Sequence, residues 1–556
     1  MSEFVVPEQY TRAVNTTHTG ESFPIPDEEK FSYGTAGFRF RAEKLSFLVF
    51  RCAYVASLRA RQLNSTIGVM ITASHNPEED NGVKLVDPSG DMLNVVWEIY
   101  ATDIVNATDA NLAAAVRSLE RQMSQIENSF IATGNTHNAR VVCGMDIRTS
   151  GPHLMEAARA GAAVFNVNFE NIGEVSTPIL HYIVKSYNFP QFAEPTVQGY
   201  YKAISDAFKE LHEITVEPEG SSYQPKLIVD CANGVGAPRF RDLLQHIPKE
   251  LLEVEFRNES GPLNHLCGAD FVKIAQKLPT SFKSEDQDPK CATFDGDADR
   301  LIYFRAKTGA EPGAAELFDG DKIACLYAMY IKEQLKAYHE TRPTYNIDMG
   351  IVQTAYANGS STRFIKDTLG LKSVIVKTGV KHLHEEASEF DVGIYFEANG
   401  HGTVVFSAHF DSIIRRHPHE NLALRRLALF SRVINETVGD AFADLLAVEI
   451  ILRHYGWSMD DWAEKMYKDV PNVQIKVPVA DRSIFETTNA EQTLVKPDGI
   501  QKMIDQDVAK FKNSRAFIRP SGTENIVRVY AEADTVENTQ ALGKSLEQVI
   551  RNLCIA

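Results

Sequence analysis

Three aspartates alternate in the segment DGDADR, where Asp295, Asp297 and Asp299 follow the β-rich run CATF. Carboxylates at alternate positions of a tight loop can converge on one hard divalent cation, and oxygen ligands favour Mg²⁺ or Ca²⁺ over zinc. An EF-hand is excluded, because its sixth position requires glycine and Arg300 stands there. Acids that only cap a turn are the alternative. Crowding like charges without a cation costs free energy, which favours the metal.

A second segment, RPSGTENIVRVY, has the composition of an anion site. It combines a guanidinium fork, two hydroxyls and unhindered backbone amides, which together suit a phosphate dianion. An ordinary hairpin with Pro-Ser-Gly turn chemistry is the alternative. The groups concerned are Arg519, Ser521, Gly522, Thr523 and Arg528.

Two other glycine-containing loops carry polar groups. EANGHGT supplies Glu397, Asn399 and His401, a mixture of donors and acceptors suited to sugar hydroxyls, although Asn-Gly is also typical of hairpin turns. YGTAGFR presents Thr35 and Arg39 in a run of small residues that either approaches an anion closely or simply makes a turn.

Ser74 stands in TASHNPEED, between small and turn-forming residues. A Ser-His-acid hydrolase would require a strained elbow such as G-x-S-x-G, which this segment lacks. A loop hydroxyl and an N-cap remain open, as does phosphorylation. A phosphoserine carries about −1.5 to −2 charges and would require a cation nearby, which the aspartate loop offers.

These loops follow apolar, β-rich runs, and amphipathic segments lie between them. ARVVCGMDIRTSG and KLIVDCANGVGAP each close on an aspartate before a turn, as KCATFDGDADR does. Alternating strands and helices predict α/β domains whose ligands gather beyond the carboxyl ends of strands. A helix is expected in TDANLAAAVRSLERQMSQI, with one buried face, and the last helix is expected to start with a capping box at Asp534. The buried face comprises Leu112, Val116, Leu119, Met123 and Ile126.

The chain has 556 residues, which is too long for one core and predicts three to five domains. No apolar run is long enough for a bilayer and no secretory signal is found, so a cytoplasmic protein is expected. Seven cysteines without CxxC spacing argue against a disulfide framework or a zinc site. A net charge of −17 disfavours nucleic acid and anionic membranes as partners.

Four motifs in this order, TASHNP, DGDADR, EANGHG and RPSGTEN, resemble those of the α-D-phosphohexomutase superfamily. Within it, YGTAGFR, NGVKLVDPSGDML and EANGHGT look like the eukaryotic phosphoacetylglucosamine mutases. Other branches typically carry a GEESGH-like sugar loop. The resemblance implies three α/β domains with mixed sheets and a smaller C-terminal α+β domain around a central cleft. The expected boundaries are 1–175, 176–305, 306–450 and 451–556.

The resemblance also implies roles for the motif residues. Ser74 matches the phosphoserine, and Asp295, Asp297 and Asp299 match ligands of Mg²⁺, which an oxygen of the Ser74 phosphate completes. The expected substrate-binding residues are Thr35, Lys381, Glu397, Asn399, His401, Arg519, Ser521, Gly522, Thr523 and Arg528.

The proton-transfer group is open among several residues. His75 is preferred as this group because an unperturbed histidine titrates near neutral pH. Arg39 is expected to be a second catalytic residue. Lys84 and Lys381 are further candidates, although Lys84 is also expected simply to pair with nearby acids such as Asp80.

The implied reaction interconverts N-acetylglucosamine 6-phosphate and 1-phosphate through a phosphoserine and a bisphosphate sugar, supplying UDP-N-acetylglucosamine synthesis. The alternatives are a phosphoglucomutase or phosphomannomutase, a Mg²⁺-dependent sugar phosphatase, and a catalytically inactive sensor of sugar phosphates. The expected partner is a small phosphosugar, and the expected oligomeric state is a monomer or weak homodimer.

Overall fold

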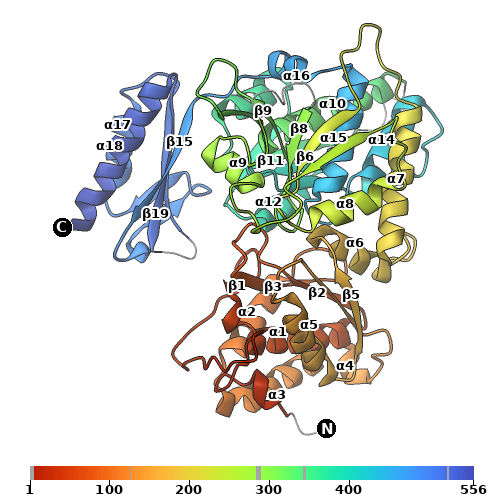
Figure 1. Ribbon diagram of the computed structural model, residues 1–556, viewed down its shortest axis with the longest axis vertical. Helices are drawn as coiled ribbons and strands as arrows, with labels where there is room; N and C mark the ends of the chain where they lie inside the picture. Colours follow the sequence, from red (N-terminus) through yellow and green to blue (C-terminus); the bar gives the residue numbers. More distant parts are fainter. Residues whose placement is uncertain (1–4, 127, 284–289, 342–345, 522–524, 556) are drawn as a thin grey trace. The chain divides into compact units, whose positions relative to one another are not determined.

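The computed structural model describes residues 5–126, 128–283, 290–341, 346–521 and 525–555 (Figure 1). The chain divides into two compact units, each assembled from separate stretches of sequence. The first unit comprises Met1–Thr215, Gln224–Leu317 and Leu429–Ile450, and the second comprises Val216–Tyr223, Phe318–Ala428 and Ile451–Ala556.

The first sheet of the first unit has the order β1-β3-β2-β4-β5. Its strands β2, β4 and β5 are parallel, whereas β3 runs antiparallel to both β1 and β2. Helices α1 (Ser46–Leu63) and α5 (Gly151–Ala163) pack closely, since a Cβ at Gly161 would lie 2.1 Å from the carbonyl oxygen of Phe50. The strands are β1 (Phe38–Arg41), β2 (Thr66–Ile71), β3 (Asp80–Val86), β4 (Arg140–Met145) and β5 (Asn168–Glu174).

The second sheet of this unit has the order β10-β9-β8-β6-β7. Strand β6 is parallel to both β7 and β8, and β9 returns antiparallel to β8, so the aspartate loop is the connection between β8 and β9. The strands are β6 (Lys226–Asp230), β7 (Glu253–Arg257), β8 (Lys290–Thr293), β9 (Ile302–Ala306) and β10 (Ala315–Phe318).

A late segment of the chain, Leu429–Ile450, completes the core beneath this sheet. At the start of α15 (Ala441–Tyr455), Phe442 stacks on Phe240 with ring centroids 5.0 Å apart and lies 5.4 Å from Phe294. The Ala441 amide donates a hydrogen bond of 3.1 Å to the carbonyl of Ala298, inside the aspartate loop. Residues far downstream therefore support that loop.

The second unit holds a four-stranded sheet of order β12-β11-β13-β14. Strand β11 is parallel to β12 and β13, and β14 is antiparallel to β13. Helix α12 (Val380–Ala387) packs on β11 and β13. The strands are β11 (Met349–Thr354), β12 (Lys372–Val376), β13 (Val392–Phe396) and β14 (Gly402–Phe406).

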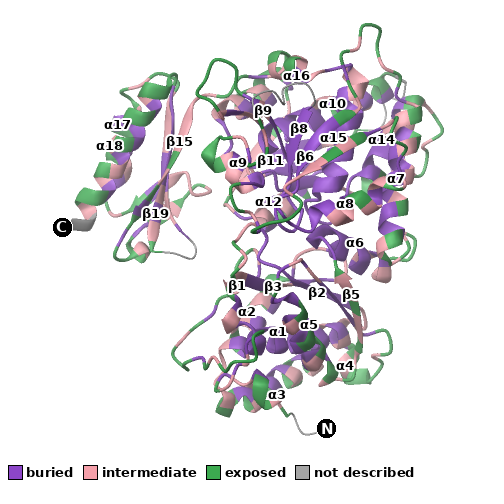
Figure 2. Ribbon diagram, in the orientation of Figure 1, coloured by how far each residue is buried: buried purple, intermediate pink, exposed green. Residues whose placement is uncertain are grey.

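The C-terminal segment forms a three-stranded antiparallel sheet, β15-β19-β18, and a two-stranded hairpin, β16-β17. Helix α18 packs on β15 and β19 through one face and alternates buried and exposed residues in Figure 2. The elements are β15 (Asn472–Pro478), β16 (Glu486–Thr488), β17 (Thr493–Lys496), α17 (Ile500–Val508), β18 (Arg515–Pro520), β19 (Ile526–Glu532) and α18 (Val536–Ile555).

The remaining helices lie around these sheets; α6 packs on β2 and β4, whereas α2 and α3 pack on other helices. They are α2 (Val95–Asn106), α3 (Asp109–Gln125), α4 (Phe130–Thr133), α6 (Thr177–Asn188), α7 (Val197–Glu213), α8 (Gly236–Leu244), α9 (Ala269–Ala275), α10 (Gly320–Thr341), α11 (Gly359–Arg363), α13 (Ala408–Phe410), α14 (Leu422–Val433) and α16 (Met459–Lys465).

Two details of the predicted helices are wrong. Helix α3 buries four of the five expected residues, but it ends at Gln125, and Ile126 is an extended, exposed C-cap. At α18 the Thr535 hydroxyl, rather than the expected Asp534, accepts the capping hydrogen bond, from the Asn538 amide at 3.1 Å. Within the described residues, no helix combines the length and apolarity required to cross a membrane.

Candidate functional site

Ser74 lies in the connection that follows β2, at the carboxyl end of that strand. Its backbone is left-handed, with φ of 52°, and its side chain is fully buried. The Oγ hydroxyl donates a hydrogen bond of 2.7 Å to Oδ2 of Asp295, and the Ser74 amide donates one of 2.9 Å to Oγ1 of Thr72. A non-glycine residue keeps this conformation only where its surroundings hold it.

Two side chains that no sequence motif indicates hold the backbone of the Ser74 loop. The Arg148 guanidinium donates to the carbonyls of Asn76 at 2.6 Å and Ser74 at 3.3 Å. Nδ2 of Asn264 lies 3.0 Å from each of the same two oxygens. Arg148 is itself paired with the buried Asp146 carboxylate. The only sequence signal was the turn after Asp146.

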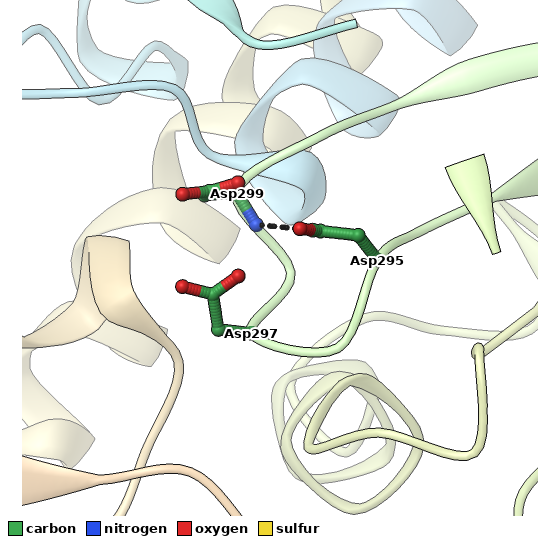
Figure 3. Close-up of side chains that lie close together, drawn as sticks. All are labelled: Asp295, Asp297 and Asp299. Carbon is green, nitrogen blue, oxygen red and sulfur yellow. Dashed lines mark hydrogen bonds between the residues drawn. The ribbon is translucent and has the colours of Figure 1, made fainter. Parts of the chain in front are cut away.

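The three aspartates of DGDADR converge as expected. Carboxylate oxygens of Asp295, Asp297 and Asp299 all lie within 4.8 Å of one another, and all three residues are buried. Oδ1 of Asp295 accepts a hydrogen bond of 3.1 Å from the Asp299 amide, which closes the loop on itself (Figure 3). Gly296 permits the approach of the Ser74 loop, because a Cβ there would lie 2.6 Å from the Ser74 carbonyl oxygen.

This carboxylate cluster fits a hard divalent cation. Oδ1 of Asp297 is buried and has no hydrogen-bond partner among the residues that the structure describes. Burial, with the charges of Asp299 and Asp297, raises the pKa of Asp295 well above its ordinary value. Such a cluster is costly to ionise by itself, and a divalent cation bound by carboxylate oxygens would remove that cost.

Lys84, on β3, partly balances the acids. Its Nζ lies 3.3 Å from Asp297 and 3.4 Å from Asp299, so the expected pairing with Asp80 is wrong; Asp80 instead accepts a hydrogen bond from Asn76. Burial and Asp299 act to raise the pKa of Asp297, but the charge of Lys84 and other groups outweigh them and leave that pKa lowered.

The pKa of His75 in this environment departs from that of an unperturbed histidine. Burial, followed by the charges of Arg300 and Arg39, lowers the pKa of His75 well below its usual value. Its Nδ1 is buried without a hydrogen-bond partner among the described residues. The imidazole is therefore neutral at pH 7 when the site holds no metal. This environment depends on residues far apart in sequence.

Arg39 lies on β1, opposite Gly82 of β3. A tight turn precedes it, in which the amides of Gly34 and Gly37 donate to each other's carbonyls, and Thr35 is exposed at its tip. Gly37 has φ of 79°, and a Cβ there would lie 2.2 Å from a backbone oxygen of β3. Only glycine fits this turn.

The predicted sugar loop joins β13 to β14 in the second unit. Oε1 of Glu397 accepts a hydrogen bond of 3.3 Å from the Gly379 amide, and Oε2 accepts one of 3.2 Å from Asn399. Oδ1 of Asn399 in turn accepts from the His401 backbone amide at 3.0 Å. Lys381 is buried on the first turn of α12, the helix that follows Gly379.

The predicted phosphate loop follows β18. Arg519 on β18 and Arg528 on β19 are direct partners in the antiparallel register, so the two side chains leave the same face of the sheet. Ser521 is buried, and its amide donates to the carbonyl of Ile526 at 2.9 Å. Gly522 and Thr523 lie outside the described residues.

Arg519 already has an anionic partner that the sequence did not indicate. Its Nη1 donates to Oε1 of Glu491 at 2.6 Å, and its Nε donates to the hydroxyl of Tyr356 at 3.2 Å. Glu491 comes from the β16-β17 hairpin, and Tyr356 from the connection after β11. Neither segment carries a recognisable phosphate motif.

Four family models match along the chain. Residues 319–457 and 192–302 match "Phosphoacetylglucosamine mutase AMG1" domains III and II. Residues 475–548 match the phosphoglucomutase/phosphomannomutase C-terminal domain, and 50–111 with 117–194 match its α/β/α domain I. The four-domain architecture expected from the resemblance is thereby confirmed.

Curated relatives match over nearly the whole chain. The phosphoacetylglucosamine mutase of Candida albicans is 44% identical over 95% of this chain and 98% of its own length. The human phosphoacetylglucosamine mutase is 43% identical over 94% of each chain.

Solved structures agree with these relatives. One, described as N-acetylglucosamine-phosphate mutase in the substrate complex, is 42% identical and superposes with a TM-score of 0.87, covering 94% of this chain and 97% of its own. The Aspergillus fumigatus N-acetylphosphoglucosamine mutase in complex with GlcNAc-6P and magnesium is 40% identical, with a TM-score of 0.86 and coverage of 95% and 97%.

Proposed function

Because the chain belongs to the phosphoacetylglucosamine mutases of the α-D-phosphohexomutase superfamily, we propose that it interconverts N-acetylglucosamine 6-phosphate and N-acetylglucosamine 1-phosphate. The product serves UDP-N-acetylglucosamine synthesis. The observation that carries this proposal is the hydrogen bond of 2.7 Å between the buried hydroxyl of Ser74 and Asp295, one of three convergent carboxylates.

Ser74 is the residue through which phosphorus passes. In the first step the bond between Oγ of phosphoserine 74 and phosphorus breaks, and the free hydroxyl oxygen of the sugar monophosphate forms the new bond to phosphorus. The proton of that hydroxyl ends on Oγ, which restores the Ser74 hydroxyl. The resulting bisphosphate sugar reorients and returns its other phosphoryl group to Ser74. Positioning and charge neutralisation supply most of the catalysis in such transfers.

Phosphorylation of Ser74 makes a cation necessary. A phosphoryl group would replace the Oγ proton that is now donated to Asp295, and the dianion would then face the carboxylates of Asp295, Asp297 and Asp299. These aspartates would hold Mg²⁺, the cation named in the Aspergillus complex. When bound, Mg²⁺ offsets charge on the transferring group.

The other proposed roles divide between the two ends of the substrate. Arg519 and Arg528 hold the phosphate that is not reacting, together with the loop that carries Ser521, and both substrate orientations use this one site. At the reacting end, Arg39 and Lys84 supply positive charge near the aspartates. His75, which follows Ser74 in the same loop, is proposed to take part in proton transfer at this end.

The remaining predicted groups are proposed to contact the sugar. Glu397, Asn399 and His401 lie in the β13-β14 connection and, with Lys381 on α12, offer both donors and acceptors. Thr35, exposed at its turn, is proposed to contact substrate as well, and Gly522 and Thr523 are proposed to complete the phosphate loop.

A parallel assay tests this function. Purified protein receives Mg²⁺, a trace of bisphosphate sugar, and either N-acetylglucosamine 6-phosphate or glucose 6-phosphate, and both 1-phosphate and free phosphate are followed. We expect 1-phosphate from the amino sugar and no net phosphate release. Faster turnover of glucose 6-phosphate would indicate a phosphoglucomutase, and released phosphate would indicate a phosphatase.

Ser74→Ala should abolish isomerisation, because no atom remains to carry the phosphoryl group. Ser118→Ala, an exposed serine on α3, is the matched control and should retain full activity. Undiminished isomerisation by the Ser74 variant would overturn the mechanism.

We further propose that the protein acts in the cytoplasm as a monomer or weak homodimer. Sedimentation at several protein concentrations tests the oligomeric state, and a stable higher oligomer would contradict it.

A further inference from the structure

A carboxylate lies on the arginine that is proposed to hold the substrate phosphate. Oε1 of Glu491 accepts from Nη1 of Arg519 at 2.6 Å, and its Oε2 accepts from the backbone amide of Thr378 at 2.9 Å. Both side chains are largely shielded, at 16% and 13% exposed. Glu491 therefore joins the arginine of β18 to the connection between β12 and α12.

The backbone that carries Glu491 is unfavourable by itself. Asn489, Ala490 and Glu491 are three consecutive non-glycine residues in the left-handed region, with φ of 52°, 52° and 67°. Such residues are strained, and the conformation persists only where other interactions hold it. The two hydrogen bonds of the Glu491 carboxylate supply such interactions.

The local charge balance leaves room for an anion. Arg519 and Arg528 are partners across β18 and β19, and Nε of Arg528 is buried with no hydrogen-bond partner among the described residues. Among the described residues, Glu491 is the only acidic side chain that forms an ion pair with either arginine. Two guanidinium groups and one carboxylate thus leave a net positive charge.

A phosphate and the Glu491 carboxylate require the same donors. A guanidinium binds phosphate best through two neighbouring N–H groups, but Arg519 uses Nη1 for Glu491 and Nε for Tyr356. A phosphate dianion added beside the carboxylate would also meet like charge. Binding is strongest when the carboxylate leaves.

We propose that Glu491 is a displaceable counter-ion that occupies the distal phosphate site in the ligand-free protein, and that the phosphate of the sugar substrate takes its place on Arg519. This inference rests on the proposed role of Arg519 in phosphate binding. Release of Glu491 also frees the Thr378 amide, next to Gly379, whose own amide donates to Glu397 of the sugar loop. Phosphate binding to Arg519 is thereby linked to the sugar loop through the adjacent residues Thr378 and Gly379.

Calorimetric titration of the full-length protein with inorganic phosphate tests the competition. Glu491→Gln keeps the size of the side chain and removes its charge, so we expect the dissociation constant for phosphate to fall about 10-fold, which corresponds to about 1.4 kcal/mol. In the mutase assay KM should fall by a similar factor without a rise in kcat. For Glu491→Asp, whose side chain is shorter, the dissociation constant and the KM should lie between those of the parent and those of Glu491→Gln.

Glu486→Gln is the matched control. Glu486 lies on the same hairpin, where it pairs with Lys496 at 2.7 Å, and both side chains are more than half exposed. Its substitution should leave phosphate binding unchanged. In an Arg519→Gln background, Glu491→Gln should no longer tighten binding, because the competition has lost its donor.

The opposite outcomes overturn the inference. Weaker phosphate binding in Glu491→Gln would mean that the carboxylate orients Arg519 for phosphate, and unchanged binding, or no binding by either protein, would mean that no competition exists. The phosphate titration does not depend on catalytic activity. If Glu491→Gln binds phosphate more tightly but the parent does not isomerise sugar phosphates, the proposed function is rejected and the inference about Glu491 stands.

Discussion

The ammonium group of Lys84 lies 3.3 Å from Oδ2 of Asp297, on the carboxylate cluster proposed to hold Mg²⁺. Lys84→Gln removes this partner, and breaking a buried ion pair on one side costs about 3–5 kcal/mol. We therefore expect the metal-free variant to unfold at a lower temperature than the metal-free parent. Addition of Mg²⁺ should raise its melting temperature by more than it raises that of the parent.

Thermal unfolding with and without a chelator measures both shifts. Lys44→Gln, which disrupts a partly exposed pair with Glu29, is the control and should respond to Mg²⁺ as the parent does. Equal shifts in the Lys84 variant and the parent would contradict a cation at this cluster.

Arg148 fixes the backbone on either side of His75. Arg148→Gln removes donors to the Ser74 and Asn76 carbonyls and leaves the buried Asp146 without its cation. We expect a loss of stability of about 3–5 kcal/mol and, at temperatures where the variant is folded, a kcat at least 10-fold lower. Denaturant unfolding and steady-state kinetics measure the two effects.

Arg159→Gln on α5 is the control, since Arg159 forms an exposed pair with Glu156. A folded Arg148 variant with normal kcat would show that Arg148 stabilises the domain but does not position Ser74.

Gly296 sets the distance between the Ser74 loop and the aspartate loop. A methyl group at Gly296 would lie 2.6 Å from the Ser74 carbonyl oxygen, so Gly296→Ala must push the loops apart. A displacement of about 1 Å can cost 10²-fold in rate, and we expect kcat to fall by about that factor. Gly309→Ala has open space around it and tests backbone strain alone; comparable losses in both variants would contradict the steric explanation.

His181, on α6, predicts a pH dependence of stability. Burial lowers its pKa from 6.5 to about 4, although Nδ1 donates to the carbonyl of Gly90 at 2.6 Å. Between these values the unfolded chain binds a proton that the folded protein does not. Stability is therefore lost as pH falls from 6.5 towards 4, by about 3 kcal/mol in total.

His181→Asn retains a donor for Gly90 but cannot titrate, so its stability should fall less over this range. Urea unfolding between pH 7.5 and 4 measures the difference, and His18→Asn, an exposed residue, should match the parent. Identical slopes for the parent and His181→Asn would contradict a buried neutral imidazole.

The local part of the site was predictable from sequence. Three motif loops follow strands, after β2, β8 and β18, and a fourth joins β13 to β14. An apolar, β-rich run that ends in glycine and acidic residues is typical of a strand followed by a turn. The convergence of Asp295, Asp297 and Asp299 follows from their alternate spacing in one tight loop.

Tertiary partners could not be predicted in this way. Arg148, Asn264 and Glu491 act on residues far away in sequence, and no local pattern indicates them. The lowered pKa of His75 has the same origin, since burial and remote charges decide it. The pairing of Lys84 with Asp297 rather than Asp80 likewise depends on how β3 meets the aspartate loop.

The placement of Phe442 beneath Phe240 and Phe294 has a consequence for protein synthesis. The ribosome releases the strands that carry the aspartate loop long before it makes α15, so those rings stay uncovered for on the order of ten seconds at 5–20 residues per second. We expect the nascent chain to depend on chaperones during this interval. A chain truncated before Leu429 should aggregate instead of yielding a folded N-terminal half.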